Sequence, residues 1–317
     1  MGIPKTLQEQ KALAAKGFEY VNSGDYEHAL IIAERFRKSR YTACFEIAAL
    51  AHAGMEQKEK AVAVLEEGTS VAPGVWRNWE LLGNYLSDLG RYEEAETALR
   101  RAMECPKAWT ASILMNMAIV ESRKGNPEQS LKILLEVSDP EVELPAGAIR
   151  IGVLEDLGRN EDLKIQASEV LAKEYGDDTE LEPLARISAS LGRVWLLEGR
   201  EPAEIRAMLK KALRYDPCCL SVLDLIRRVD GRFSSKACFY RCLADFKGAF
   251  DDNGARGYFS SFDVIAEDEL QAVDFIITHE DDPRIRKARV LETTQGSPAP
   301  EEALGIYSRT PCIFYMK

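Results

Sequence analysis

The stretch that decides the fold is residues 76–106, which read WRNWELLGNYLSDLGRYEEAETALRRAMECP. Gly83 and Ala95 fall where two antiparallel helices would cross, and only small side chains let two backbones approach closely. Apolar side chains at helical spacing fill the seam between them: Trp79, Leu82, Leu86, Leu99 and Ala102. Gly90 can take the left-handed conformation that ends the first helix, and Pro106 ends the second. The stretch is therefore predicted to be a helix-turn-helix unit.

The same spacing recurs before this unit. A first copy over residues 10–43 carries Gly17, Tyr20, Gly24, Tyr26, Ala29 and Ala33. A second copy carries Phe45, Ala49, Ala61, Leu65 and Pro73. The equivalent alanines Ala29, Ala61 and Ala95 are 32 and 34 residues apart. A period of this length predicts a stack of helix pairs, each burying its apolar face against the next.

The register continues after residue 106, carried mainly by turn glycines. A fourth copy contains Leu114, Ala118, Gly125, Ser130 and Leu134, and a fifth contains Ile151, Leu154, Gly158, Leu163 and Ala167. A sixth, over residues 185–217, contains Leu191, Gly192, Trp195, Gly199, Leu209 and Ala212. The interval from Gly158 to Gly199 is 41 residues, so residues 174–183 are expected to hold an inserted loop or a lengthened helix. Residues 218–230 are predicted to form one more helix that covers the last repeat.

This pattern resembles the tetratricopeptide repeat (TPR), whose Trp, Leu-Gly, Tyr, Ala, Phe and Pro positions over 34 residues are matched within residues 76–106. Leu86 and Leu99 replace two of its aromatic residues. The resemblance covers residues 10–230. It implies a mostly α fold, a right-handed α-solenoid of about six TPR-like repeats with a capping helix. We expect this helical repeat domain to occupy residues 1–233.

After Gly231 the spacing changes from helical to strand-like. Asn253-Gly254 lies between two runs rich in aromatic residues and is a hairpin signal. The predicted order is β-β-α-β-β, over residues 239–246, 258–265, 268–279, 286–293 and 305–315. We therefore expect residues 234–317 to form a small α+β domain, and no motif in it identifies a family.

Composition excludes several classes of function. The formal net charge is −11, whereas binding to nucleic acid needs a basic surface that releases counterions from phosphates. No run of about 18 apolar residues is present, so we expect no membrane span. The first residues, MGIPKTLQEQ, lack the apolar core of a signal peptide, which predicts a cytoplasmic protein. The oligomeric state stays open.

The sequence offers no pattern typical of catalysis or cofactor binding. Cys238 and Cys242 lack the Cys-x-x-Cys spacing of a zinc site and are better explained as small core side chains. Asp251 and Asp252 fit a turn better than a calcium loop, because Phe262 stands where the loop needs Glu. No phosphate-binding loop, dinucleotide fingerprint or nucleophile elbow occurs. We therefore expect no enzyme, no catalytic residue, no metal and no cofactor.

The resemblance implies where a partner binds, because the first helix of each tetratricopeptide repeat lines the concave groove of the array. The matching positions are Lys11, Phe18, Glu46, Arg77, Glu80, Asn84, Met115, Asn116, Ile119, Arg186 and Arg193. Amides on such a face can hold a peptide backbone, while Phe18, Met115 and Ile119 can hold apolar anchors. The implied partner is a protein or peptide.

One subclass of the family grips a C-terminal carboxylate with lysine, asparagine and arginine from three repeats. Asn84 and Asn116 fit that pattern, but Glu80 stands where the subclass has lysine. Pro145 and Ala148 occupy the sites of its later basic pair. A carboxylate clamp of this kind is therefore not expected.

Three functions fit the sequence. The leading hypothesis is a non-enzymatic scaffold or adaptor that binds a protein or peptide through the repeats. The first alternative is an inhibitor or immunity-type protein that neutralises a specific enzyme or toxin with its acidic C-terminal domain. The second alternative is a repeat domain that positions a ligand-sensing or catalytic C-terminal domain.

Overall fold

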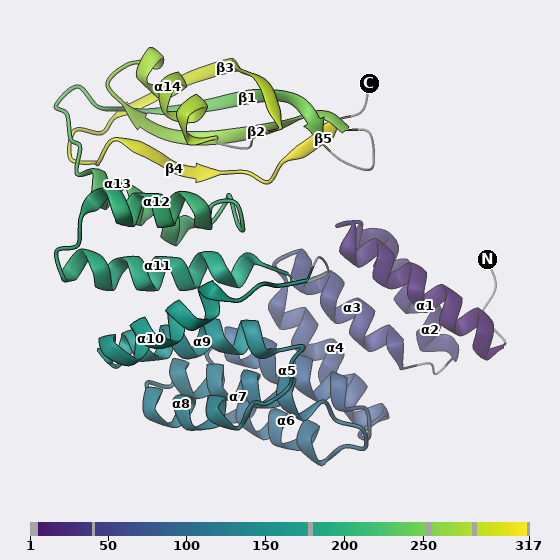
Figure 1. Ribbon diagram of the computed structural model, residues 1–317. Helices are drawn as coiled ribbons and strands as arrows, with labels where there is room; N and C mark the ends of the chain where they lie inside the picture. Colours follow the sequence, from purple (N-terminus) through teal and green to yellow (C-terminus); the bar gives the residue numbers. More distant parts are fainter. Residues whose placement is uncertain (1–5, 40–41, 177–179, 251–254, 281–283, 316–317) are drawn as a thin grey trace. The chain divides into compact units, whose positions relative to one another are not determined.

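The computed structural model describes residues 6–39, 42–176, 180–250, 255–280 and 284–315 (Figure 1). Within them the chain forms 14 helices and five strands. The helices are α1 (Leu7–Asn22), α2 (Tyr26–Ser39), α3 (Ala43–Gly54), α4 (Lys58–Val71), α5 (Trp76–Asp88), α6 (Tyr92–Glu104), α7 (Thr110–Arg123), α8 (Pro127–Glu136), α9 (Glu143–Asp156), α10 (Asn160–Ala172), α11 (Glu182–Leu197), α12 (Pro202–Ala212), α13 (Leu220–Asp230) and α14 (Glu269–His279). The strands are β1 (Cys238–Phe250), β2 (Ala255–Ala266), β3 (Ile285–Pro298), β4 (Gly305–Arg309) and β5 (Ile313–Tyr315).

The helices follow the predicted repeat. Along the sequence they form consecutive pairs from α1/α2 to α11/α12, with α13 after the last pair. Gly90 ends α5 at a φ of 76°, in the left-handed region that the sequence predicts for it. In the second pair Glu56 takes that conformation at a φ of 59°. The predicted fold class, helical repeats followed by a small sheet, is confirmed.

Close packing at Gly83 explains why the strongest repeat needs a glycine there. A Cβ added to Gly83 would lie 2.6 Å from Cγ of Leu99 and 3.1 Å from the backbone oxygen of Ala95. Carbon atoms do not approach so closely, so any side chain at this position would push α5 and α6 apart. Helix crossing at Gly83 and Ala95 is therefore as the sequence predicts.

The chain divides into two compact units, Met1–Leu157 and Gly158–Lys317. In the first unit the first helices of successive pairs form a row, because α1 contacts α3, α3 contacts α5, α5 contacts α7 and α7 contacts α9. Buried alanine, leucine and isoleucine side chains fill the space between these helices and their pair partners. The row places equivalent positions of successive repeats side by side.

The second unit begins with the irregular part of the repeat. The segment between α10 and α11 covers residues 173–181, and α11 has 16 residues where α5 has 13. The extra residues predicted here thus fall on both a longer connection and a longer helix. Residues 177–179 of that connection lie outside the described residues.

The C-terminal strands form one antiparallel sheet of order β3-β1-β2-β4, and β5 also pairs with β2. Helix α14 packs on the sheet (Figure 1). The predicted order β-β-α-β-β is confirmed, except that the last predicted strand is two strands, β4 and β5. Pro311 lies between them and has no N–H for a ladder hydrogen bond. The predicted hairpin at Asn253-Gly254 lies outside the described residues.

Within the second unit the sheet and the last helices share one core. Buried side chains from α11, α12 and α13 pack in the same cluster as those of β1, β2 and α14. The backbone N–H of Leu304 also donates to the oxygen of Arg232 at 2.8 Å. A domain boundary between residues 233 and 234 stays a prediction.

Candidate functional site

Polar side chains form a stripe along α5 that continues onto the neighbouring helices of the row. On α5 the stripe contains Arg77, Glu80, Asn84, Ser87 and Asp88, at spacings that place them on one face. On α7 it contains Ser112, Asn116 and Arg123 with the apolar Ile119 among them, and on α3 it contains Glu46. Because α3, α5 and α7 are neighbours in the row, the three stripes meet. We name this set of ten residues the polar face.

Arg77 joins two helices at one end of the polar face. Its Nε donates to Oε1 of Glu46 at 3.2 Å, and its Nη1 donates to Oε2 of Glu80 at 2.5 Å. Burial alone would lower the pKa of Arg77, but Glu80 and then Glu46 outweigh that effect and raise the pKa above its usual value. The guanidinium is therefore a fixed positive charge between α3 and α5.

Glu80 is the centre of this arrangement and is completely buried, with 0% of its side chain exposed. Besides Arg77, it accepts from Oγ of Ser112 at 2.5 Å and from Nδ2 of Asn116 at 3.1 Å. A buried carboxylate needs such partners, since an unpaired charge in the interior is strongly destabilising. Glu80 was predicted to contact a partner directly. Its burial means that it can act only by positioning Arg77, Ser112 and Asn116.

A small hollow of about 170 Å³ lies in the middle of the polar face. Its lining residues are Asn84, Ser87, Asp88, Asn116, Ile119 and Arg123. Among the described residues, no group hydrogen-bonds the side-chain amide of Asn84. That amide offers one acceptor oxygen and two donor hydrogens, the complement of a peptide bond. Ile119 provides an apolar contact beside it.

One edge of the hollow is held by charges from three helices. Arg123 donates through Nη1 to Oγ of Ser87 at 2.9 Å and to Oδ1 of Asp88 at 2.7 Å. Lys58 of α4 donates to Oδ2 of Asp88 at 3.0 Å. Partial burial by itself would raise the pKa of Asp88, but the hydrogen bonds from Arg123 and Lys58 lower it below its usual value. The carboxylate is therefore ionised at neutral pH.

The remaining predicted positions lie elsewhere. Lys11 and Phe18 are on α1, where Lys11 is exposed and Phe18 packs against the core of the first repeats. Met115 is half-buried on α7. Arg186 and Arg193 are on α11 in the second compact unit, where Arg186 pairs with Glu182 at 2.7 Å and Arg193 donates to Ser190 at 3.2 Å. The polar face thus unites Glu46, Arg77, Glu80, Asn84, Asn116 and Ile119 from the predicted set.

Sequence reasoning missed Asp88, Ser112 and Arg123 of the polar face, and also Lys58, which contacts it through Asp88. A usable signal was present, because the polar pairs of this site that cross between repeats join positions 30 to 36 residues apart, close to one repeat period. Asp88 and Arg123 have opposite charges and are 35 residues apart. Searching the repeat period for opposite charges would have found them.

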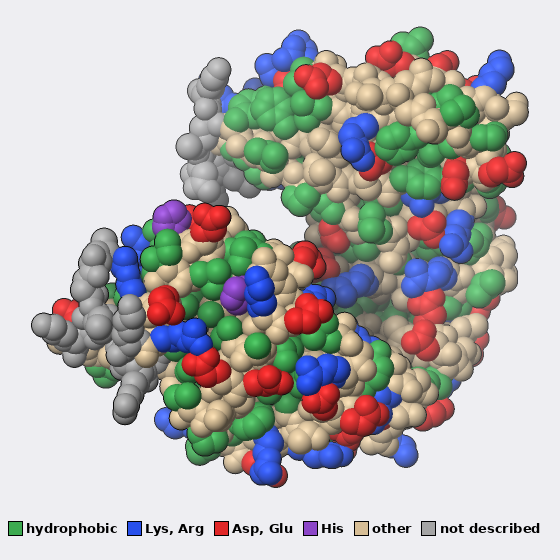
Figure 2. All heavy atoms as spheres, turned by 180° about the vertical axis from the view of Figure 1, so that it is seen from behind, with side chains coloured by type: hydrophobic (Ala, Val, Ile, Leu, Met, Phe, Trp, Pro, Cys, Tyr) green, Lys and Arg blue, Asp and Glu red, His purple; other side chains and the backbone are tan. Residues whose placement is uncertain are grey.

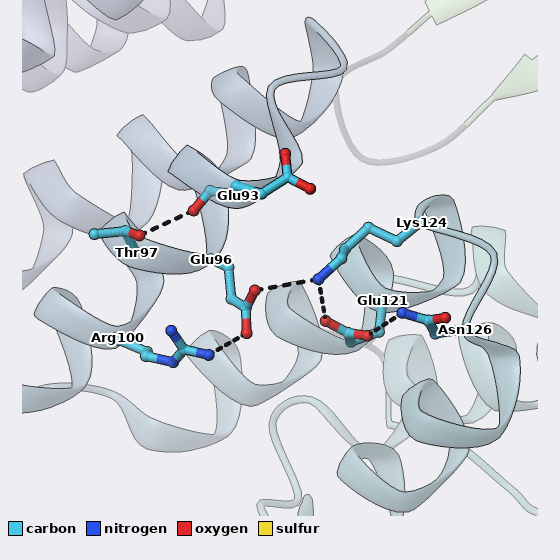
Figure 3. A network of polar contacts seen from close by, with 7 residues as sticks. All are labelled: Glu93, Glu96, Thr97, Arg100, Glu121, Lys124 and Asn126. Carbon is cyan, nitrogen blue, oxygen red and sulfur yellow. Dashed lines mark hydrogen bonds and ion pairs between the residues drawn. The ribbon is translucent and has the colours of Figure 1, made fainter.

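A second polar network, drawn in Figure 3, connects α6 to the turn between α7 and α8. Lys124 donates to Oε2 of Glu96 at 3.2 Å and to Oε1 of Glu121 at 3.1 Å. Asn126 donates to Oε2 of Glu121 at 2.9 Å, and Arg100 pairs with Glu96. The carboxylates of Glu96 and Glu121 are thus paired with the cations Arg100 and Lys124, whereas Glu93 takes part only through its backbone oxygen, which accepts from Thr97 at 2.9 Å. The contacts of this network fix successive repeats against each other.

The surface shown in Figure 2 has acidic and basic side chains interspersed, without a large field of one sign. Across the described residues, no helix is long and apolar enough to cross a membrane. The same part of the chain contains no group of three or more His, Cys, Asp or Glu side chains that could hold a metal ion.

Comparison with known proteins supports the interpretation of the repeats. A tetratricopeptide-repeat family model matches residues 81–105, within the strongest repeat at residues 76–106. The recognition of that stretch as a tetratricopeptide repeat is thereby confirmed. No curated protein matches the chain.

Solved structures of similar fold include a tetratricopeptide repeat protein and two pilus proteins. A tetratricopeptide repeat protein from Parabacteroides merdae has a TM-score of 0.56 and 17% identity, over 72% of this chain and 86% of that one. PilW, a type IV pilus biogenesis factor, has a TM-score of 0.57 and 16% identity, over 71% and 99% of the two chains. PilF of Pseudomonas aeruginosa has a TM-score of 0.53 and 14% identity, over 68% and 95%. At these identities the likeness concerns the fold.

Proposed function

We propose that this protein is a non-enzymatic, cytoplasmic interaction scaffold that binds an extended segment of a partner protein along the polar face. The observation that carries the proposal is the amide of Asn84, which lines a hollow and has no hydrogen-bond partner among the described residues. A peptide backbone placed over the hollow would supply both a donor and an acceptor to that amide.

The neighbouring groups support a peptide rather than a small polar ligand. Ile119 offers an apolar contact for a side chain of the peptide, and Asn116 lies beside it on the same helix face. The buried Glu80 fixes the Asn116 amide by accepting a hydrogen bond from its Nδ2. Preorganised groups of this kind bind with less loss of side-chain entropy.

Substitution of Asn84 tests the proposal. A library of random peptides is selected on the full-length protein, and enriched peptides are titrated by fluorescence anisotropy. We expect Asn84→Ala to weaken their binding by about tenfold, because an interface hydrogen bond of about 1.4 kcal/mol is lost. Folding should be unaffected, since the side chain has no hydrogen-bond partner among the residues that the structure describes.

Asn22→Ala is the matched control, because Asn22 is exposed at the end of α1 in the same compact unit. It should leave peptide affinity unchanged. The proposal fails if no peptide is enriched on the wild-type protein, or if Asn84→Ala and Asn22→Ala bind the enriched peptides equally.

A further inference from the structure

A cavity of about 410 Å³ lies inside the second compact unit, between the last helices and the C-terminal sheet. Three helices, α12, α13 and α14, each present one stripe of side chains to it, and the start of β4 closes it. Its volume is within the range of small-molecule sites, about 300 to 1,000 Å³. None of the residues of the polar face lines it.

The floor of the cavity is apolar. Leu223 and Ile226 of α13, Phe275 of α14 and Leu304 and Ile306 at β4 form it. Because Leu223 and Ile226 are three residues apart, they project from one face of α13. Such a floor suits an aliphatic or aromatic body.

The rim of the cavity carries more positive than negative charge. Arg206 and Arg232 share the single carboxylate of Asp230, at 2.6 Å from Nη2 of Arg206 and 3.0 Å from Nη2 of Arg232. Arg227, which also lines the cavity, pairs at 3.0 Å with Asp224, a residue outside the lining. Three guanidinium groups and one carboxylate thus line the cavity, in a protein whose net charge is −11.

Lys210 adds a further charge to the rim. It lies one turn after Arg206 on α12, is exposed, and pairs with no carboxylate among the described residues. An ammonium group beside a surplus of guanidinium groups attracts an anion, and attraction is strengthened where the wall is apolar.

Arg227 is held in place on the cavity wall by several contacts. Arg227 is only 11% exposed, donates to the backbone oxygen of Ile306 at 2.6 Å, and lies 3.8 Å from the ring centre of Tyr307. Gly305 allows this approach, since a Cβ there would lie 3.1 Å from Cγ of Arg227. A site held in this way does not have to be ordered when a ligand binds.

We propose that this cavity binds an organic anion, with its phosphate or carboxylate group held by Lys210 and Arg206 and its apolar body over Leu223, Ile226 and Phe275. The proposal uses none of the residues of the peptide-binding proposal. Either can therefore fail without the other.

Naphthyl phosphate is a suitable probe, because it combines an apolar ring system with one anionic group. Calorimetric titration of the full-length protein should show saturable binding of naphthyl phosphate. Neutral naphthol should bind about tenfold more weakly, the difference expected for one charge-assisted hydrogen bond. Inorganic phosphate at high concentration should compete with the probe. Absence of saturable binding, or equal binding of naphthol, overturns the proposal.

Two neighbouring lysines on α12 supply the matched variants. Lys210→Glu reverses the charge at the rim and should weaken the binding of naphthyl phosphate by about tenfold. Lys211→Glu makes the same change at an exposed lysine that does not line the cavity, and should leave affinity unchanged. Equal affinities of the two variants contradict the proposal.

A third variant tests occupancy of the cavity itself. Thr278 of α14 lines the cavity yet is exposed, so Thr278→Trp can fill the space without disturbing the core. We expect this variant to lose probe binding while its circular dichroism spectrum stays the same as that of the wild type. Full binding by Thr278→Trp would place the probe elsewhere and overturn the proposal.

Discussion

Arg123 at the end of α7 donates to Asp88 at the end of α5 over 2.7 Å, although 35 residues separate them. The same pairing between repeats joins Arg77 to Glu46 over 31 residues and Ser112 to Glu80 over 32. A tandem repeat places equivalent positions of successive helices side by side, so the repeat period also sets the spacing of its polar contacts. The repeat period thus determines the contacts of the polar face as well as those of the core.

Asp88 makes stability depend on pH. Its pKa is lowered in the folded protein by Arg123 and Lys58 against the effect of burial. The stability that the ionised Asp88 side chain contributes is therefore complete above its unfolded pKa of about 4. This stability is lost as the pH falls through the pKa of Asp88 in the folded protein. In urea unfolding, the wild type should be more stable than Asp88→Asn at neutral pH, and the difference should shrink below about pH 4. A difference that stays constant with pH would refute this role.

Glu80→Ala should be strongly destabilising. It leaves Arg77 without its buried partner and removes the acceptor of Ser112 and Asn116. We expect the free energy of unfolding to fall by about 3 kcal/mol, measured by urea denaturation. Glu66→Ala is the control, because Glu66 is exposed and its ion pair with Arg91 is long at 3.8 Å. This variant should lose less than about 1 kcal/mol of unfolding free energy. Similar losses for both variants would contradict the assignment.

Gly83→Ala should destabilise the first compact unit by about 1 to 3 kcal/mol, because its methyl group would clash with Leu99. Gly152→Ala makes the same change in α9, where a Cβ meets no atom within 4 Å. There the gain in helix propensity should stabilise the protein by about 0.5 to 1 kcal/mol. Thermal unfolding should therefore shift in opposite directions, and a shift of the same sign would show that Gly83 is not at a tight crossing.

Arg309 is a structural charge of the sheet. It is 3% exposed and pairs with Glu280 at 2.7 Å, while Tyr258 donates to the same carboxylate at 2.7 Å. Burial and then Glu280 raise the pKa of Tyr258. Arg309→Met should cost about 3 kcal/mol of unfolding free energy, because Glu280 is left buried without a counter-charge.

Adding Glu280→Gln to Arg309→Met removes that orphaned charge and should recover part of the loss. Urea denaturation of the two single variants and the double variant measures the coupling. If the losses of the two single variants simply add up to the loss of the double variant, the two side chains do not form the pair described.

Much of the fold could be predicted because its signals are local. Gly83, Gly90 and the alanines spaced 32 and 34 residues apart specify helix crossings and turns through short-range sterics. The alternation of aromatic residues after Gly231 similarly predicted strands. Division of the predicted last strand into β4 and β5 follows from Pro311, a local signal that was overlooked.

The candidate site was only partly predictable. Asn84, Asn116 and Ile119 were found because the resemblance assigns first helices to the groove. Lys58 of α4 and Arg123 of α7 were missed. Each acts through a contact with Asp88, which lies on another helix, α5.

The sequence by itself determined the repeat, its register and the order of helices and strands, because periodicity and turn chemistry act over a few neighbouring residues. Only the tertiary structure decided that Glu80 is buried while the Asn84 amide lines a hollow, and that Arg206, Lys210 and Arg227 surround one cavity. Burial and charge surplus are properties of side chains gathered from distant segments. They exist only once the chain has brought those segments together.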